Sequence, residues 1–246
     1  MLIALMSDIH GNREAFEACL DHARRMRVER FVFLGDYVGY GADPVYVVDT
    51  VARMVEDGAV ALIGNHDEAV FEPGGGMNPI ARAAIEWTRG QLDDAHRAFL
   101  RERPYTVEEG ERLFAHANGY APQGWGYITE SLAAERSMRS TRCRVTFCGH
   151  VHVPALFFMA AGRGAAHFTP VAGAGIPLIP HRRWLAVIGA VGQPRDGEPA
   201  ACYALLHDEQ STLTYVRVPY DIDTAAQKIL EAGLPERLAA RLYRGQ

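Results

Sequence analysis

The sequence contains almost no lysine and no closely spaced cysteines. Lys228 is the single lysine, so the other formal cations are arginines, and a Schiff-base or lysine-nucleophile enzyme is not indicated. A CxxC pair is typical of redox motifs and zinc ribbons, and the sequence contains none. The cysteines are Cys19, Cys143, Cys148 and Cys202. We therefore expect free thiols in a reducing cytoplasm.

Long hydrophobic runs and excess positive charge are also missing. The longest apolar stretch, 153–161, is well short of the ~20 residues that span a bilayer, and the apolar start at 2–6 is too short for a secretory signal. We therefore expect a cytoplasmic protein with no membrane partner. The formal net charge of −5 gives no general attraction to nucleic acid. A phosphate-bearing partner would have to be held by local groups or by a metal.

What the sequence does contain is an ordinary globular composition and a repeated pattern of strand and helix. The 246 residues are 48% hydrophobic and 22% charged, which suits one domain spanning residues 1–246. The alternation of strands and helices in the first part predicts a parallel sheet with right-handed crossovers. Strands are predicted at 2–6, 31–34 and 59–63, and helices at 15–23, after an N-cap at Asn12, and at 44–55.

The rest of the chain has a different pattern. After a glycine cluster at 74–76, helical spacing at 80–92 and 95–100 predicts a helical excursion at about 77–102, for which packing on the core is favoured over a cap or a partner surface. Short apolar runs then follow one another and predict a second, largely antiparallel or mixed sheet. These runs are 105–107, 113–115, 145–148, 156–159, 184–188, 203–206 and 213–218. Further helices are predicted at 131–139 and 224–243, the latter broken near 233–235.

Side chains that can bind metals stand where the predicted strands end. They are Asp8, His10, Asp36, Asn65, His116, His150 and His152. Ligands of open α/β sheets gather at the carboxyl ends of the strands, so we expect these side chains to share one crevice. In Asp8/His10 and His150/His152, the i, i+2 spacing would send both side chains the same way on an extended backbone, so each pair could grip one ion.

Each motif alone also has an ordinary structural explanation. An isolated DxH is close to noise, His116 could be a core histidine bonded to backbone, and the runs at 64–67 and 149–152 could be tight turns. The joint occurrence of all the pieces at strand ends favours a metal site. Mixed imidazole, amide and carboxylate ligands favour Mn, Fe, Zn, Co or Ni over Ca or Mg.

The ordered motifs resemble the signature of the calcineurin-like metallophosphoesterases. That signature of DxH, GD, GNHD or GNHE, a later H and finally GHxH is present at 8–10, 35–36, 64–67, 116 and 149–152. The resemblance implies an α/β fold, a four-layer α/β/β/α sandwich of two mixed sheets flanked by helices, with two divalent metal ions. It implies that Asp8, His10, Asp36 and His152 hold the first ion, and that Asp36, Asn65, His116 and His150 hold the second, with Asp36 bridging.

The resemblance also implies a reaction. A hydroxide bridging the two metal ions, manganese or another transition metal, would attack the phosphodiester bond of a small or nucleotide-like substrate. His66, which is not a ligand by this resemblance, would stabilise the transition state and protonate the departing oxygen. Asp67 is expected to be a local structural partner.

Departures from the family's protein serine/threonine phosphatases indicate a different branch. Those phosphatases carry an arginine after GD and another before GNHE, whereas this chain has the run 37–41 and Ile63 there. The run after GD and the run 190–197 resemble the small prokaryotic phosphodiesterases. Arg195 could reach a substrate phosphate or pair with a surface carboxylate, and is left out of the predicted site. The glycine- and aromatic-rich segment 118–127 could line the pocket or merely anchor its loop.

These patterns predict a phosphodiesterase with a small phosphoester substrate. The alternatives are a phosphomonoesterase or dinucleoside polyphosphate hydrolase and a non-catalytic scaffold of the same fold. Retention of every predicted ligand and of His66 argues against the scaffold. A nuclease is disfavoured by the net acidity and the lack of a basic run. The oligomeric state does not follow from the sequence.

Overall fold

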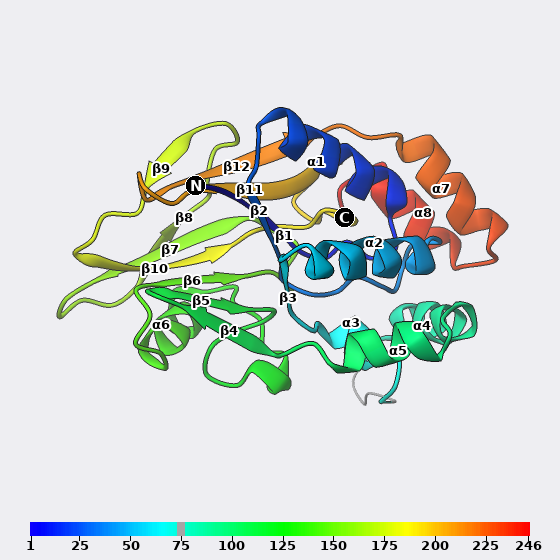
Figure 1. Cartoon of the computed structure of the whole chain (residues 1–246), viewed down its shortest axis with the longest axis horizontal. Coiled ribbons are helices and arrows are strands. Elements are labelled where there is room, and N and C mark those ends of the chain that lie inside the picture. Colours follow the sequence, from blue (N-terminus) through cyan, green and yellow to red (C-terminus); the bar gives the residue numbers. More distant parts are fainter. Residues whose placement is uncertain (73–76) are drawn as a thin grey trace.

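Two mixed sheets of six strands each face one another, with helices on their outer sides (Figure 1). This computed structural model describes residues 1–72 and 77–246, so the glycine cluster at 74–76 lies outside the described residues. The arrangement is the α/β/β/α sandwich that the sequence motifs predict. Within the described residues, no helix combines the length and the hydropathy needed to cross a bilayer.

The first sheet joins the beginning of the chain to its last strands. Its order is β3 (Val60–Ala61), β2 (Arg30–Phe33), β1 (Leu2–Met6), β11 (Ala201–His207), β12 (Thr212–Val218) and β9 (Gly175–Pro177). The first three strands are parallel, as predicted. The assignment of 203–206 and 213–218 to the second sheet is wrong, because β11 lies antiparallel to β1. A central position suits β11, which is buried along almost its whole length.

The second sheet has the predicted mixed character. Its order is β4 (Thr106–Glu109), β5 (Arg112–Ala115), β6 (Val145–Cys148), β10 (Arg182–Val187), β7 (Ala155–Ala160) and β8 (Ala166–Phe168). The strands β5, β6 and β10 are parallel, and the remaining pairs are antiparallel. Strands β8 and β9 were not predicted, because β8 is exposed throughout and neither carries a hydrophobic pattern.

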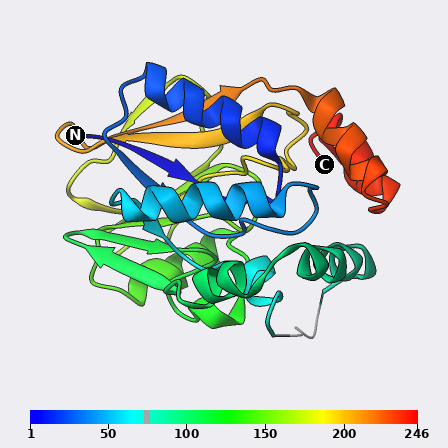
Figure 2. The ribbon, with the colours of Figure 1, turned by 45° about the vertical axis from the view of Figure 1, so that its right-hand side comes forward.

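The helices cover the outer faces and one end of the sandwich (Figure 2). They are α1 (Arg13–Arg25), α2 (Pro44–Glu56), α3 (Asn65–Glu68), α4 (Pro79–Gln91), α5 (Asp94–Arg101), α6 (Ser131–Arg139), α7 (Ile222–Glu231) and α8 (Glu236–Leu242). Helices α1 and α2 cross the first sheet, and α6 packs on the second. Helix α1 begins at the predicted cap, where the Asn12 side chain accepts the N–H of Ala15 at 3.1 Å.

The inner faces of the two sheets bury a continuous apolar core. Leu5 and Val32 of the first sheet pack in the same cluster as Phe114, Phe147 and Trp184 of the second. A separate cluster joins α4 to α7 and α8, so the predicted helical excursion packs on its neighbours as expected. The core between the two sheets fixes them relative to each other, and so fixes the loops that leave their carboxyl ends.

Candidate metal centre

The loops that leave the parallel strands converge at one edge of the sandwich. From the first sheet, Asp8 and His10 follow β1, Asp36 follows β2, and Asn65 opens α3 just after β3. From the second, His116 follows β5, and His150 and His152 follow β6. The structure therefore brings all seven predicted ligands together, as the position of the motifs at strand ends indicates.

One group of four ligand atoms forms around Asp8. His152 Nε2 lies 3.1 Å from Asp8 Oδ1 and 3.2 Å from His10 Nε2. His10 Nε2 is in turn 3.6 Å from Asp36 Oδ2. These four ligand atoms all lie within 4.8 Å of one another, and their residues are buried. They are the residues that the resemblance assigns to the first ion.

A second group shares Asp36 with the first. His116 Nε2 is 3.5 Å from Asp36 Oδ2 and 3.2 Å from His150 Nδ1. Asn65 Oδ1 lies 3.2 Å from the same nitrogen of His116. The Asp36 Oδ2 atom is thus almost equally far from His10 and from His116. A carboxylate in that position can contact both groups.

The far side of each ligand histidine is held by a backbone carbonyl. Each carbonyl oxygen can accept the N–H of one ring nitrogen, so that the neutral form of the ring presents the lone pair of its other nitrogen inward. The contacts are His10 Nδ1 to Val38 O at 3.0 Å, His116 Nδ1 to Leu34 O at 2.8 Å, His150 Nε2 to Trp125 O at 2.9 Å and His152 Nδ1 to Gln193 O at 2.7 Å. Four imidazoles are therefore oriented as ligands.

The donors that meet in this crevice fit divalent cations. Asp8 Oδ1 is buried and has no hydrogen-bond partner among the described residues, although a buried carboxylate oxygen is costly to leave unpaired. The facing ring nitrogens of His10 and His152, and of His116 and His150, lie 3.2 Å apart, and in their neutral forms a shared cation would take up their lone pairs. The mixture of nitrogen and oxygen donors matches transition-metal chemistry.

The backbone at five of the seven predicted ligands is left-handed rather than extended. The φ angles are 55° at Asp8, 50° at His10, 58° at Asp36, 65° at His150 and 63° at His152. The prediction of an extended DxH and HxH backbone is therefore wrong, although each pair does reach the same crevice. Non-glycine residues in this region cost about 1–2 kcal/mol each, a strain that is typical of functional sites.

Glycines next to the ligands permit close backbone approach. A Cβ atom on Gly64 would lie 2.2 Å from Asp36 Oδ1, and one on Gly149 would lie 1.8 Å from the Ser7 hydroxyl. Both distances are far below van der Waals contact. These two glycines therefore let the chain pass very close to the ligand side chains.

Burial and charge set the protonation of the cluster in the metal-free protein. Burial raises the pKa of Asp36, but the charges of His116 and His66 outweigh it and hold that pKa well below its usual range. Burial lowers the pKa of His116, but Asp36 more than compensates and raises it to about 9. Burial lowers the pKa of His150 to about 3. At neutral pH Asp36 is therefore ionised and His150 neutral, which are the forms that bind metal, whereas His116 carries a proton that a bound metal would have to displace.

His66 lies beside the ligand groups without joining either. Its side chain is buried, and its ring packs 4.5 Å from the Tyr40 ring and 4.8 Å from the His10 ring. Its backbone N–H donates to Asp36 Oδ1 at 2.8 Å. Burial lowers the pKa of His66 to about 4, so the free imidazole is neutral. The ring is therefore close enough to the site to act on a bound group.

Asp67 has the local structural contacts expected of it. Its carboxylate accepts the backbone N–H of Asp36 at 2.7 Å, Tyr37 at 2.8 Å, Gly64 at 2.9 Å and Val38 at 3.3 Å. These bonds tie the loop after β2 to the start of α3. The loops that carry Asp36 and Asn65 are thus locked together by one side chain.

Comparison with known proteins identifies the family. A model of the calcineurin-like phosphoesterase superfamily domain matches residues 1–211. The chain belongs to this superfamily. An uncharacterized protein of Methanocaldococcus jannaschii is 32% identical over 251 residues, covering 100% of this chain and 98% of the relative.

Solved structures agree with this assignment. A metallophosphoesterase from Sphaerobacter thermophilus is 34% identical, with a TM-score of 0.89 over 100% of this chain and 99% of the other. A hypothetical protein from Pyrococcus horikoshii shares the fold at 18% identity, with a TM-score of 0.81 over 100% of this chain and 98% of the other. The predicted family and fold class are confirmed.

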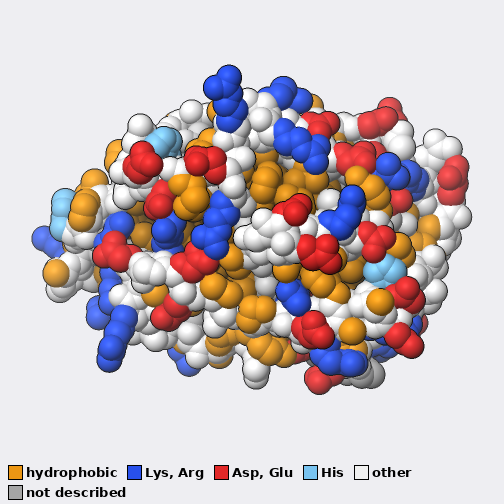
Figure 3. All heavy atoms as spheres, viewed as in Figure 1, with side chains coloured by type: hydrophobic (Ala, Val, Ile, Leu, Met, Phe, Trp, Pro, Cys, Tyr) orange, Lys and Arg blue, Asp and Glu red, His pale blue; other side chains and the backbone are white. Residues whose placement is uncertain are grey.

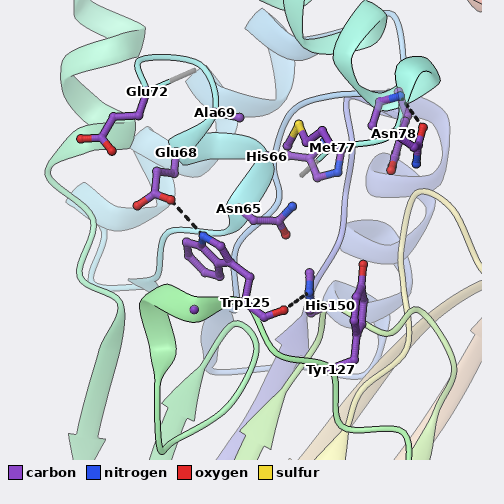
Figure 4. A pocket seen from close by; sticks show the side chains of 13 residues that line it. Asn65, His66, Glu68, Ala69, Glu72, Met77, Asn78, Trp125, Tyr127 and His150 are labelled. Atoms are coloured by element: carbon purple, nitrogen blue, oxygen red, sulfur yellow. Dashed lines mark hydrogen bonds between the residues drawn. The ribbon is translucent and has the colours of Figure 1, made fainter. Parts of the chain in front are cut away.

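This calcineurin-like phosphoesterase has a cavity of about 520 Å³ beside the candidate metal centre (Figure 4). Asn65, His66 and His150 line it. Trp125 and Tyr127 line it too, which favours the pocket-lining alternative for the segment 118–127.

Sequence reasoning missed Glu68 as a pocket residue. Its carboxylate accepts the Tyr105 hydroxyl at 2.5 Å and the Trp125 Nε1–H at 2.9 Å. An acidic residue directly after the GNHD motif was the available signal. Its two partners are distant in sequence, so no local pattern could reveal them.

Among the described residues of this calcineurin-like phosphoesterase, Arg195 does not pair with a surface carboxylate, which was one of its two predicted alternatives. Its guanidinium is 5.7 Å from the centre of the Tyr40 ring and donates to Gln193 Oε1 at 3.2 Å. The neighbouring Asp196 pairs with Arg217 instead. Arg195 therefore places a positive charge behind Tyr40, which itself packs on His66.

Proposed function

We propose that this calcineurin-like phosphoesterase hydrolyses phosphodiester bonds of small or nucleotide-like compounds, with two divalent transition-metal ions. The observation that carries the proposal is the position of Asp36 Oδ2, 3.6 Å from His10 Nε2 in one ligand group and 3.5 Å from His116 Nε2 in the other. Two ligand groups that share a carboxylate are the arrangement expected of a dinuclear site.

The proposed ligands divide as the groups do. The first ion would be held by Asp8, His10, Asp36 and His152, and the second by Asp36, Asn65, His116 and His150. When bound, such ions lower the pKa of a shared water and neutralise charge on the phosphoryl oxygens. Asp8 and Asp36 are the only anionic ligands, so the loaded cluster stays positive enough to attract a phosphodiester.

His66 is proposed as the proton donor. It lines the cavity and is neutral when free, because burial lowers its pKa to about 4. A bound anionic phosphoryl group would raise that pKa, since a nearby negative charge favours the imidazolium form. His66 could then protonate the oxygen that leaves phosphorus, which is general acid catalysis by a positioned side chain.

The finer assignments belong to the same proposal. Manganese is the first metal to test among Mn, Fe, Zn, Co and Ni, all of which accept this mixed donor set. The four cysteines are free and buried, which supports a reducing, cytoplasmic location. The resemblance of the run 190–197 to the small prokaryotic phosphodiesterases supports that branch, and one domain spanning 1–246 stays part of the proposal.

Hydrolysis of dinucleoside polyphosphates and cleavage of nucleic acid are less well supported by the surface of the molecule. The described lining of the cavity contains no lysine or arginine, which disfavours an extended polyphosphate there. On the face drawn in Figure 3, acidic and basic side chains are interspersed, without the continuous basic band typical of nucleic-acid binding. A small diester with one negative charge agrees best with both features.

The test is hydrolysis of bis(4-nitrophenyl) phosphate beside 4-nitrophenyl phosphate, after Mn²⁺ is added to metal-stripped protein. We expect faster turnover of the diester, dependent on added metal and abolished by Asp36→Asn. Asp57→Asn, an exposed change at the end of α2, is the matched control and should keep full activity. Faster turnover of the monoester would replace the phosphodiesterase assignment with a phosphatase.

A further inference from the structure

The walls of the cavity combine aromatic faces with negative charge. Trp125 and Tyr127 line it from one loop, and Glu68 and Glu72 line it from α3 and the residues that follow (Figure 4). Neither glutamate forms an ion pair within residues 1–72 and 77–246. Two formal negative charges thus lie at the wall of a cavity whose described lining has no arginine or lysine.

Glu68 is held in place by neutral groups only. The Tyr105 hydroxyl donates to Oε1 at 2.5 Å, and the indole N–H of Trp125 donates to Oε2 at 2.9 Å. These bonds fix the orientation of the carboxylate but do not neutralise its charge. A positioned and partly desolvated carboxylate attracts a cation more strongly than a mobile surface one does.

The aromatic side of the cavity is fixed by the metal centre itself. Trp125 has a left-handed backbone, with a φ of 52°, and its carbonyl oxygen accepts the Nε2–H of His150 at 2.9 Å. The Tyr127 ring stacks on His150 with centroids 4.1 Å apart and planes 10° apart. Tyr127 is nevertheless 55% exposed, so one face of its ring packs on a candidate ligand while the other stays accessible.

We propose that this cavity binds one organic arm of the substrate and that the arm carries an ammonium cation, which makes the substrate a zwitterionic phosphodiester. The proposal rests on the proposed function, because it places the phosphoryl group at the candidate metal centre and the arm beside it. Aromatic faces attract cations through the negative charge of the ring face, and carboxylates add a direct Coulomb term. A polyphosphate arm would instead bring negative charge against Glu68 and Glu72.

A matched pair of chromogenic diesters tests the charge of the arm. In one ester of 4-nitrophenyl phosphate the arm is 2-(trimethylammonio)ethyl, and in the other it is the uncharged 3,3-dimethylbutyl group of the same shape. With the manganese-loaded protein at low salt, we expect kcat/KM to favour the charged arm about tenfold. The preference should shrink as salt is raised, because exposed charges are screened.

Variants locate the effect in the cavity. Glu68→Gln should reduce the preference to about twofold, because it removes one charge while keeping an acceptor for Trp125, and Glu72→Gln should reduce it partly. Glu56→Gln removes the same charge from the exposed end of α2 and should leave the preference unchanged. Equal turnover of the two esters would overturn the proposal, and so would a preference that survives both Glu68→Gln and Glu72→Gln. Faster turnover of a thymidine ester, whose base is neutral, than of the ester with the charged arm would also overturn it.

Binding separates this proposal from the catalytic one. The methylphosphonate monoesters of the same two alcohols carry no nitrophenyl group, and calorimetry on metal-loaded protein gives their affinities whether or not any ester is hydrolysed. Tighter binding of the ammonium form, weakened by Glu68→Gln, supports the cationic arm even if phosphodiester turnover is absent. Equal affinities contradict the cationic arm even if the enzyme cleaves diesters well.

Discussion

Replacing Asp67 by asparagine should destabilise the protein strongly without removing any predicted ligand. The two side chains have nearly the same shape, but the Asp67 carboxylate accepts four backbone N–H groups, two on each oxygen. In asparagine, one oxygen becomes an NH₂ group that faces two N–H donors. Those donors are then buried without an acceptor.

The magnitude follows from counting the orphaned donors. Each buried donor left unpaired costs about 1–3 kcal/mol, so two of them cost about 4 kcal/mol. Burial and the charge of Asp36 raise the pKa of Asp67 to about 8, so loss of that buried charge offsets part of this cost and makes it an upper value. Domains are stable by only ~5–15 kcal/mol, so this is a large share. At ~2–4 °C per kcal/mol for a chain of this size, the melting temperature should fall by about 8–16 °C.

Thermal melts and urea titrations of metal-stripped Asp67→Asn measure this directly. Working without metal separates folding stability from any loss of ion binding. The matched control, Asp57→Asn, makes the same chemical change at an exposed position and should stay within ~0.5 kcal/mol of the parent protein. A loss below 1 kcal/mol for Asp67→Asn would refute the idea that this carboxylate locks the two loops together.

Three further changes test the site. His66→Ala should lower kcat by ~10²–10⁴ with metal content intact, and unchanged turnover would remove His66 from the mechanism. Gly149→Ala should reduce metal content, measured by elemental analysis, because the added Cβ would lie 2.5 Å from Asp8 Oδ2. The control Gly90→Ala adds a Cβ in open space on α4, so it should keep the metal content and slightly stabilise the helix. Burial lowers the pKa of His66 to about 4 in the folded protein, whereas the same side chain in the unfolded, metal-free chain has a pKa of ~6.5. As the pH falls from ~6.5 toward 4, His66 therefore binds a proton in the unfolded chain but not in the folded one, and the free energy of unfolding should decrease. His66→Gln should make that decline in urea midpoint shallower, and an identical slope would contradict the assignment.

The location of the site followed from the sequence because its signals are local. Asp8, Asp36 and His116 each stand directly after an apolar run, and parallel strands bring such positions to one edge. Which strands pair with one another could not be predicted from such local signals. Nothing in the alternation of residues 201–218 says whether β11 pairs with β1 or with the second sheet, because both places bury the same apolar side chains.

Other features escaped prediction because they depend on contacts between distant residues. The left-handed backbone of His150 and His152 was not predictable, because histidine adopts that region more often than most residues but still far less often than extended or helical backbone. The bond from Trp125 to Glu68 joins positions 57 residues apart, and no periodic pattern marks it. The short strands β8 and β9 lie on the surface, where burial leaves no hydrophobic signal.

The central place of β1 in its sheet has a consequence for biosynthesis. One neighbour of β1 is β2, but the other is β11, which the ribosome adds roughly 200 residues later, or about 10–40 s at ~5–20 residues per second. The carbonyl oxygens of Ser7 and Asp8 accept hydrogen bonds from the N–H groups of Val191 and Gly192, at 2.9 Å each, and these donors are also translated late. All seven proposed ligands are therefore translated before the segment that fixes the first of them. We expect the chain to acquire its metal only after nearly complete synthesis, from whatever ions then surround it.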